Sequence, residues 1–421
     1  MTDELLRASR LAYDTAPPVG DPAFLRYPDE LARALAESWP LVLEANARDV
    51  QAAQDRGLPP VLLDRIRLGE AHLEQLRTLT RSVADELPDV LKPGPESPVG
   101  KAASLRKVPK PLGVALMVYE ARPTVTVEGA LLPVVTGNAV ILRGGKEIAA
   151  TNAALSTVVG KALAASGLPT GMVTTLDDPS RAVLRELLGR GDAIDVLIPR
   201  GSPSLIDYCR TTSTIPVIAS GGGVNHLYVH ESADLALAAA VALDSKLAEP
   251  TACNTLELVL VDERVATPFA AALADAAEQE VTFRLDERIT APTRADGALW
   301  QIAALAEHDF GREFLEPAIG VRAVAGLAEA VEHIRRFGSM HTEGVVSGDE
   351  RVAAEFVKQV DAAAIVVNGS LRLHDGPTLG LGAEVSISTG RLHERGPVTM
   401  RSLLTHTWLV AANGTLRSTV S

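Results

Sequence analysis

The pattern of apolar and polar positions changes character near residue 113. Before that point apolar residues recur at helical spacing, as in Leu31, Leu35 and Trp39, so residues up to about 90 are predicted to be helical. The Pro- and Gly-rich stretch 89–99 is predicted to be a connector. The short basic segment 101–108 that follows is typical of an exposed strand.

From residue 113 onward, apolar runs of strand length alternate with helical patterns. Strands are predicted over Gly113–Val118, Ala139–Arg143, Met172–Leu176 and Ile194–Ile198, with helices over about 120–136, 147–166 and 179–188. This alternating order predicts a mostly parallel sheet with helices on both faces.

A second α/β unit is predicted to begin near residue 221. Ser232 is a plausible N-cap for an Ala- and Leu-rich helix that runs to about Leu247. Further strands are predicted over Leu227–Val229, Thr255–Val261, Val321–Val324, Gly344–Val346 and Ala363–Val367, with a helix around Ala328–Phe337. The order again indicates an α/β fold.

Composition narrows the class of protein. The 421 residues are 47% hydrophobic, which is enough for two or three domains. The formal net charge of −13 argues against nucleic acid and anionic membrane surfaces as general partners. The first residues carry acids where a signal peptide carries bases, and the longest apolar runs are too short to span a bilayer. We expect a cytoplasmic globular protein.

Glycines follow two of the predicted strands. They occur in Arg143-Gly144-Gly145 and in Gly201-Ser202, each between a strand and a helix. Each pair is either a plain turn or part of a site where helix N–H groups hold a pyrophosphate. Arg143 and Lys146 would suit an additional phosphate, such as the 2′-phosphate of NADP.

The two cysteines differ in their surroundings. Cys209 lies within a predicted helix and is interpreted as a buried apolar thiol. Cys253 lies in a loop before a buried strand, where it is either a nucleophile or another buried thiol. Metal-binding patterns such as H-E-x-x-H or paired C-x-x-C are absent from the sequence, so no metal site is expected. The absence of G-x-S-x-G argues against an α/β-hydrolase.

Several segments together resemble the gamma-glutamyl phosphate reductases of the aldehyde dehydrogenase superfamily, in that family's order and over nearly the whole chain. They are Tyr119–Pro123, Gly137–Gly145, Asp195–Gly201, Ser213–Val217, Cys253-Asn254, Glu313–Leu315, His341–Glu343, Gly380–Glu384 and Leu392–Pro397.

The resemblance implies an aldehyde dehydrogenase-like α/β fold, with two three-layer α/β/α domains and a small oligomerisation element. It places a cofactor-binding domain at 1–220, a catalytic domain at 221–388, and a C-terminal return with an oligomerisation strand at 389–421. The oligomerisation element would combine 101–112 with a strand near 404–412, which implies a homo-oligomer, a dimer or tetramer.

The resemblance also implies a reaction. NADPH would reduce L-glutamyl 5-phosphate to L-glutamate 5-semialdehyde and phosphate in proline biosynthesis. Cys253 falls on the family's nucleophile position, and Asn254 is a candidate donor to the oxyanion. The expected cofactor-binding residues are Arg143, Gly144, Gly145, Lys146, Gly201, Ser202 and Glu313, and the expected substrate-binding residues are Arg122, Lys246, Arg372, Asp375 and Glu384.

The chain lacks a glutamate that would direct the reaction toward a free acid. Aldehyde dehydrogenases that make free acids carry a Glu before the Gly-Gly of the junction between their domains. This chain has Ala219 at that position. Without a base to activate water, a thioester is expected to wait for hydride or phosphate.

Some residues depart from the family's pattern near the nucleophile. Glu249 replaces an Arg, Asp244 replaces an Asn, and Thr124 also replaces an Asn. Either these loops tolerate change, or the acyl group differs from glutamate, being less anionic or carrying an amine where glutamate carries its carboxylate. A non-catalytic nucleotide-binding paralogue is a third alternative. Because the sequence contains no apparent kinase module, a separate enzyme such as glutamate 5-kinase would supply the acyl phosphate.

Overall fold

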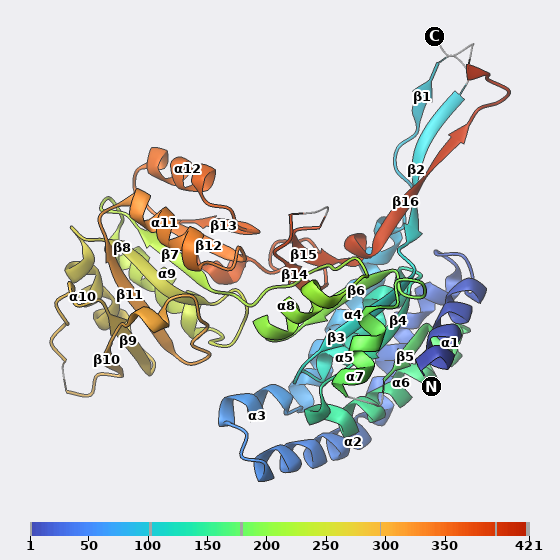
Figure 1. Ribbon diagram of the computed structural model, residues 1–421, viewed down its shortest axis with the longest axis horizontal. Helices are drawn as coiled ribbons and strands as arrows, with labels where there is room; N and C mark the ends of the chain where they lie inside the picture. The colour runs from blue at the N-terminus through green and yellow to red at the C-terminus, as the bar shows by residue number, and fades with distance from the viewer. Residues whose placement is uncertain (1, 101–102, 177–179, 295, 392–393, 418–421) are drawn as a thin grey trace. The chain divides into compact units, whose positions relative to one another are not determined.

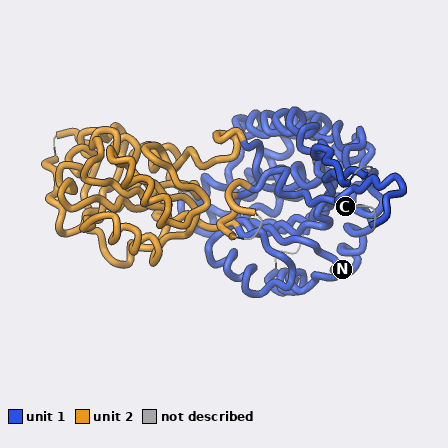
Figure 2. The backbone as a smooth tube through the Cα atoms, turned by 90° about the horizontal axis from the view of Figure 1, so that it is seen from above, with its two compact units in different colours: residues 1–219, 381–386, 398–421 blue, residues 220–380, 387–397 orange. Residues whose placement is uncertain are grey.

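The computed structural model describes residues 2–100, 103–176, 180–294, 296–391 and 394–417 (Figure 1). The chain divides into two compact units (Figure 2): unit 1 is 1–219, 381–386 and 398–421, and unit 2 is 220–380 and 387–397. Parts of three predicted segments lie outside the described residues, namely 101–102, 179 and 392–393.

Four helices begin unit 1, as the helical spacing before residue 90 predicts. They are α1 (Thr2–Thr15), α2 (Pro22–Asp55), α3 (Pro60–Ile66) and α4 (Glu70–Val90). In α2, Leu31, Leu35 and Trp39 form one buried face, which recurs every three to four residues. Asp21 caps the first turn by accepting the N–H of Ala23.

The sheet of unit 1 is parallel, in the order β5-β4-β3-β6. Its strands are β3 (Val114–Tyr119), β4 (Ala139–Arg143), β5 (Val173–Thr175) and β6 (Val196–Arg200), and its helices are α5 (Thr124–Val135), α6 (Ala149–Ser166), α7 (Arg181–Leu188) and α8 (Pro203–Thr212). The stretch Lys146–Ser166 is long and apolar enough to cross a membrane by length and composition. Part of it is buried, including Leu155, Val158 and Leu163 in the core of this unit.

Unit 2 contains a parallel sheet in the order β10-β9-β11-β8-β7-β12-β13. Its strands are β7 (Asn225–Val229), β8 (Leu256–Asp262), β9 (Val281–Leu285), β10 (Trp300–Ala304), β11 (Ala318–Val324), β12 (Thr342–Val346) and β13 (Ala364–Val367), and its helices are α9 (Leu235–Leu247), α10 (Ala266–Ala276), α11 (Leu327–Phe337) and α12 (Glu350–Gln359). Strands β9 and β10 and helices α10 and α12 were not predicted. The expected α/β fold class is confirmed.

The N-cap of α9 differs from the prediction. Asp234 caps the helix, because its carboxylate accepts the N–H groups of Ala236 and Leu237. The predicted cap, Ser232, was wrong: its hydroxyl hydrogen-bonds with the ring of His230 and accepts the N–H of Gly348.

Among the described residues, two small sheets remain, of which the first is antiparallel. One joins β1 (Ser97–Val99), β2 (Ala103–Pro111) and β16 (Leu404–Ala411); β2 and β16 are the two segments that the family resemblance combines (Figure 1). The other pairs β14 (Glu384–Ser388) with β15 (Gly396–Thr399), where the chain passes between the units. Short 3₁₀ turns occur at Lys146–Ile148, Thr170–Met172, Glu307–Asp309, Leu371–Leu373 and Met400–Leu403.

Candidate active site

Cys253 is half-buried in the loop between α9 and β8, and Asn225 holds the backbone of this loop. The Nδ2 of Asn225 donates to the carbonyls of Cys253, at 2.8 Å, and Thr255, at 2.7 Å. Its Oδ1 accepts the N–H of Thr342 at 3.1 Å. A fully buried amide with both ends satisfied therefore fixes the backbone on which the candidate nucleophile sits.

The backbone at Gly223 passes directly against this loop. A Cβ at Gly223 would lie 1.4 Å from the carbonyl oxygen of Cys253, so a larger residue cannot occupy the position without moving the loop. The N–H of Gly223 donates to Oε1 of Glu313 at 3.0 Å. Glu313, an expected cofactor contact, is therefore hydrogen-bonded to a residue that packs against the nucleophile loop.

Asn254 joins the nucleophile loop to the 371–375 loop. Its buried Nδ2 donates to the carbonyls of His374, at 2.9 Å, and Arg372, at 3.5 Å. Among the described residues its Oδ1 has no partner. To donate to an oxyanion, as the sequence suggested, Nδ2 would use the N–H that makes the longer contact with Arg372 and would keep its bond to His374, because the amide nitrogen carries two hydrogens.

Lys246 is fully buried, although it is an expected substrate-binding residue. Its Nζ lies 2.9 Å from Oε2 of Glu257, which also accepts the N–H of Phe314. Burial lowers the pKa of Lys246 and raises that of Glu257 to about 7, against the attraction between the two. In this arrangement the ammonium group neutralises Glu257 instead of facing solvent.

Arg372 and Asp375 occupy the loop that Asn254 contacts. Nη2 of Arg372 lies 3.0 Å from Oε2 of Glu249, the residue that departs in charge from the family pattern. The Oδ1 of Asp375 accepts the N–H of Thr378 and shapes the loop. The unusual Glu249 is therefore the ion-pair partner of an expected substrate-binding arginine.

The remaining expected substrate residues lie in unit 1. Arg122 is half-buried between β3 and α5, and Glu384 is half-buried at the start of β14. Of the other departures, Thr124 begins α5 in this unit, whereas Asp244 lies exposed on α9 in unit 2.

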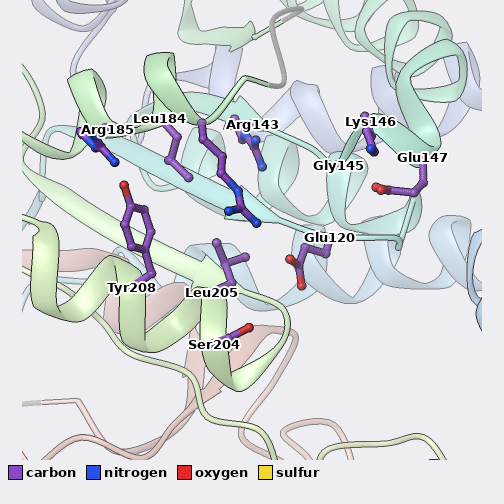
Figure 3. A pocket seen from close by; sticks show the side chains of 11 residues that line it. Glu120, Arg143, Gly145, Lys146, Glu147, Leu184, Arg185, Ser204, Leu205 and Tyr208 are labelled. Atoms are coloured by element: carbon purple, nitrogen blue, oxygen red, sulfur yellow. The ribbon is translucent and has the colours of Figure 1, made fainter.

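A cavity of about 550 Å³ opens in unit 1 at the carboxyl ends of the strands (Figure 3). Arg143, Gly145 and Lys146, all expected to bind the cofactor, line it. Helices α7 and α8 add side chains that the sequence analysis did not identify, namely Arg181, Leu184 and Arg185 from α7, and Ser204, Leu205 and Tyr208 from α8.

Close backbone packing surrounds this cavity. A Cβ at Gly144 would lie 2.0 Å from Nδ2 of Asn152, and one at Gly201 would lie 2.5 Å from Oε2 of Glu120. The N–H of Ser202 donates to the same oxygen of Glu120 at 2.8 Å, while its hydroxyl caps α8. These glycines and the serine form close turns after β4 and β6, and the N–H of Ser202 is already bonded to Glu120.

Basic side chains outnumber acidic ones along the cavity wall, where Glu120 and Glu147 are the acids. This local charge suits an anionic ligand despite the net charge of the whole chain. Cys209 lies fully buried on α8, and burial raises its pKa to about 11. It is a core thiol, as predicted.

Sequence reasoning did not single out Asn225 or Glu120. Asn225 lies outside the quoted family segments, and Glu120 lies within Tyr119–Pro123 but was given no role of its own. The arginines of α7 gave a weak signal, because two bases four residues apart are common on helix surfaces. Among the described residues, no cluster of His, Cys, Asp and Glu has the arrangement of a metal site.

Comparisons with known proteins define the class. The model of the aldehyde dehydrogenase family matches residues 66–295. A gamma-glutamyl phosphate reductase of Roseiflexus castenholzii is 43% identical over 382 residues, which cover 90% of this chain and 89% of the relative. That of Escherichia coli O81 is 41% identical over 394 residues, 93% of each chain.

Solved structures agree. The gamma-glutamyl phosphate reductase of Thermotoga maritima superposes with a TM-score of 0.83 at 30% identity over 99% of both chains. An engineered glycolyl-CoA reductase with bound NADP+ shares the fold, with a TM-score of 0.72 at 16% identity over 97% of this chain and 96% of that one. The chain belongs to the aldehyde dehydrogenase family and, within it, to the gamma-glutamyl phosphate reductases. It is an oxidoreductase of a family that uses nicotinamide cofactors.

Proposed function

We propose that this chain reduces L-glutamyl 5-phosphate to L-glutamate 5-semialdehyde and phosphate with NADPH, a step of proline biosynthesis. The observation that carries the proposal is Cys253 itself, at the family's nucleophile position and on a loop that Asn225 and Gly223 hold in place. The names of the relatives from Roseiflexus castenholzii and Escherichia coli support the choice of substrate.

The chemistry divides into two steps at Cys253. Its thiolate attacks the acyl carbon, the carbon–oxygen bond to phosphate breaks, and inorganic phosphate leaves with the electron pair, which gives a thioester. NADPH, when bound, supplies the hydride that reduces the acyl group. The tetrahedral adduct then collapses, the carbon–sulfur bond breaks, and the aldehyde and the thiolate are released.

Two features of the chain direct this reaction toward reduction. Ala219 replaces the Glu that activates water in acid-forming aldehyde dehydrogenases, so the thioester is expected to survive until hydride arrives. In unit 1, the cavity lined by Arg143, Gly145 and Lys146 has the volume and local charge to bind part of a dinucleotide. Gly144, Gly201 and Ser202 of the same unit are proposed to complete this part of the cofactor site, and Glu313 of unit 2 is proposed as a separate cofactor contact.

A coupled assay tests the proposed function. Glutamate, ATP and a separate glutamate 5-kinase generate the acyl phosphate, and the loss of NADPH is followed after this protein is added. We expect NADPH oxidation that depends on all components and disappears in Cys253→Ala. If NADPH is not consumed although the kinase product is present, the proposed substrate is wrong.

The ion pair between Glu249 and Arg372 favours a second candidate, the same chemistry on a different amino-acid-like acyl phosphate. With Arg372 already neutralised, the site suits an acyl group that is less anionic or carries an amine where glutamate carries its carboxylate. Competition between acyl phosphates distinguishes the candidates. Reduction of the glutamyl compound at an ordinary rate, with the others left untouched, excludes the second.

Three further properties are proposed alongside the reaction. The exposed strand β16, with Trp408, Leu409 and Val410, supports assembly into a dimer or tetramer. A kinase that delivers the labile acyl phosphate directly is a plausible partner, and a cytoplasmic location suits both. Light scattering of the purified protein, with and without the kinase, tests the first two.

A further inference from the structure

In unit 2, a ring of hydrogen bonds joins Thr342 on β12 to the loop that carries the candidate nucleophile. Through its backbone, Thr342 donates to Oδ1 of Asn225, whose Nδ2 in turn holds the carbonyl of Cys253. Through its hydroxyl, Thr342 contacts Nδ1 of His374 at 2.8 Å. The carbonyl of His374 accepts the amide of Asn254. Thr342 is therefore linked to Cys253 through Asn225 and to Asn254 through His374.

The hydrogen bonds of the Thr342 hydroxyl require a particular protonation of two histidines. The hydroxyl oxygen of Thr342 lies 2.7 Å from Nδ1 of His341 and 2.8 Å from Nδ1 of His374. One hydroxyl proton serves only one of these nitrogens, so the other ring must donate from its own Nδ1. The pair is then bonded through one shared oxygen, and its two rings pack edge to face at 5.4 Å.

Both rings are neutral at working pH. Burial lowers the pKa of His341 and of His374 to about 4. Glu313 and Glu343 face His341 and oppose this shift, and Asp375 does the same for His374. Neutral rings leave one Nδ1 able to accept and the other able to donate, as the shared hydroxyl requires.

We propose that Thr342 is a positioning residue for the reaction, which holds Cys253 in its attacking geometry through Asn225 on one side and through His374 and Asn254 on the other. Every member of this ring apart from Cys253 is buried, and each contact is a hydrogen bond of ordinary length. A network of this kind loses more than one contact when a member is removed. The inference rests on the proposed function only in taking Cys253 as the nucleophile.

The experiment compares Thr342→Val with Thr342→Ser. Valine keeps the shape of the side chain and removes the hydroxyl, whereas serine keeps the hydroxyl. We expect Thr342→Val to lower kcat for acyl-phosphate reduction roughly tenfold, with KM within twofold of the parent, because a displaced nucleophile slows attack more than binding. Thr342→Ser is expected to restore most of kcat.

A second measurement tests the positioning role independently of the proposed substrate. The burst of nitrophenolate from p-nitrophenyl acetate reports acylation of the thiol without any glutamyl compound. We expect the burst to vanish in Cys253→Ala, to slow about tenfold in Thr342→Val, and to recover in Thr342→Ser. A burst that survives in Cys253→Ala overturns the nucleophile assignment instead.

A matched control tests for general loss of stability. Thr80 in α4 is also buried, and its hydroxyl donates to the carbonyl of Arg77 in its own helix. Thr80→Val is expected to lower the melting temperature without slowing the burst. If Thr342→Val, folded by circular dichroism, shows the parent's burst rate and kcat, or if Thr342→Ser is as slow as Thr342→Val, the positioning role is overturned.

Discussion

At the scale of single residues, Gly223 has the tightest steric requirement near the nucleophile. In Gly223→Ala the added Cβ would overlap the carbonyl oxygen of Cys253, at 1.4 Å, so the loop must move. We expect kcat to fall about a hundredfold, since displacements of about 1 Å cost that much. Steady-state kinetics measure it.

Gly160 in the interior of α6 supplies the control for this substitution. A Cβ there would have nothing within 4 Å. Gly160→Ala should leave kcat unchanged and stabilise the helix by up to about 1 kcal/mol. Parent-like kcat in Gly223→Ala would contradict the described packing of the loop.

Substitution of Glu249 offers a direct test of how charge at the site affects substrate binding. In Glu249→Gln, Arg372 loses its ion-pair partner and becomes available to an anionic substrate. We expect KM for glutamyl phosphate to fall several-fold, and stability to change by less than about 1 kcal/mol, because the pair is partly exposed. Kinetics of the parent and variant provide the comparison.

The same substitution tests whether Glu249 acts by neutralising Arg372. Glu355→Gln, which breaks an exposed pair with Lys358 on α12, is the control and should leave KM unchanged. A rise in KM for glutamyl phosphate in Glu249→Gln would contradict this role and would mean that Glu249 attracts a positive group of the substrate, such as its α-ammonium group.

Local sequence was enough for only some of the candidate residues. The predicted helix indicated that Cys209 is a core thiol, which the structure confirms, whereas the loop around Cys253 left its role open and only the family resemblance indicated a nucleophile. Glu249 was singled out by its charge against the family pattern. Asn225 and Thr342 were not predictable, because their hydrogen bond joins residues 117 positions apart. Lys246 has the residue type of a substrate cation, yet burial pairs it with Glu257.

At the scale of elements, α7 contributes Arg181 and Arg185, one helical turn apart, to the cavity of unit 1. Figure 3 shows Arg185 among the side chains that line it. We expect the double change Arg181→Gln, Arg185→Gln to weaken NADPH binding about tenfold and NADH binding much less. The reason is that guanidinium groups recognise the extra phosphate of NADPH. Titrations of nucleotide fluorescence measure both affinities.

Arg210→Gln on α8 is the control for charge alone, since Arg210 pairs with Asp207 on the surface and does not line the cavity. It should leave both affinities unchanged. Equal losses of NADPH and NADH affinity in the α7 variant would contradict a phosphate-specific role.

Short strands made of continuous apolar runs were predictable, and a partly exposed strand at a sheet edge was not. Strand β4 matches its predicted range because it is a continuous run of buried apolar residues that ends at Arg143. Strand β10 was missed because it lies at the sheet edge with Gln301 and Ile302 exposed. The N-cap of α9 was misplaced because Ser232 and Asp234 both have capping side chains, and only the backbone conformation decides between them.

At the scale of the whole molecule, buried histidines make stability depend on pH. The pKa values of His341 and His374 fall from 6.5 to about 4 through burial. Between these values the unfolded chain binds protons that the folded chain does not, so stability falls as pH drops from about 6.5 to 4. From pH 7.5 to 5.0 we expect a loss of about 2 kcal/mol from each ring.

Urea denaturation followed by circular dichroism at those two pH values measures the loss. In His374→Gln the difference between the two values should shrink, and in His308→Gln, which changes an exposed histidine, it should not. An unchanged unfolding free energy at pH 5.0 in the parent would contradict neutral buried rings.

Charge shows how far whole-chain properties predict function. The net charge of −13 argues against polyanionic partners, but it gives no indication of the basic cavity wall in unit 1. The order of strands and helices, together with the family motifs, was enough to predict the fold class. The hydrogen bonds around the nucleophile depend on which loops the sheet of unit 2 brings together, and composition does not encode that.

The central claim is that Cys253 carries the acyl group during the reaction. The most direct measurement is intact mass spectrometry of the protein after brief exposure to glutamyl phosphate without NADPH, followed by peptide mapping. We predict one added glutamyl group on Cys253, which is lost when NADPH is added and never forms in Cys253→Ala. An unmodified Cys253, or an adduct on another residue while turnover proceeds, would contradict the account.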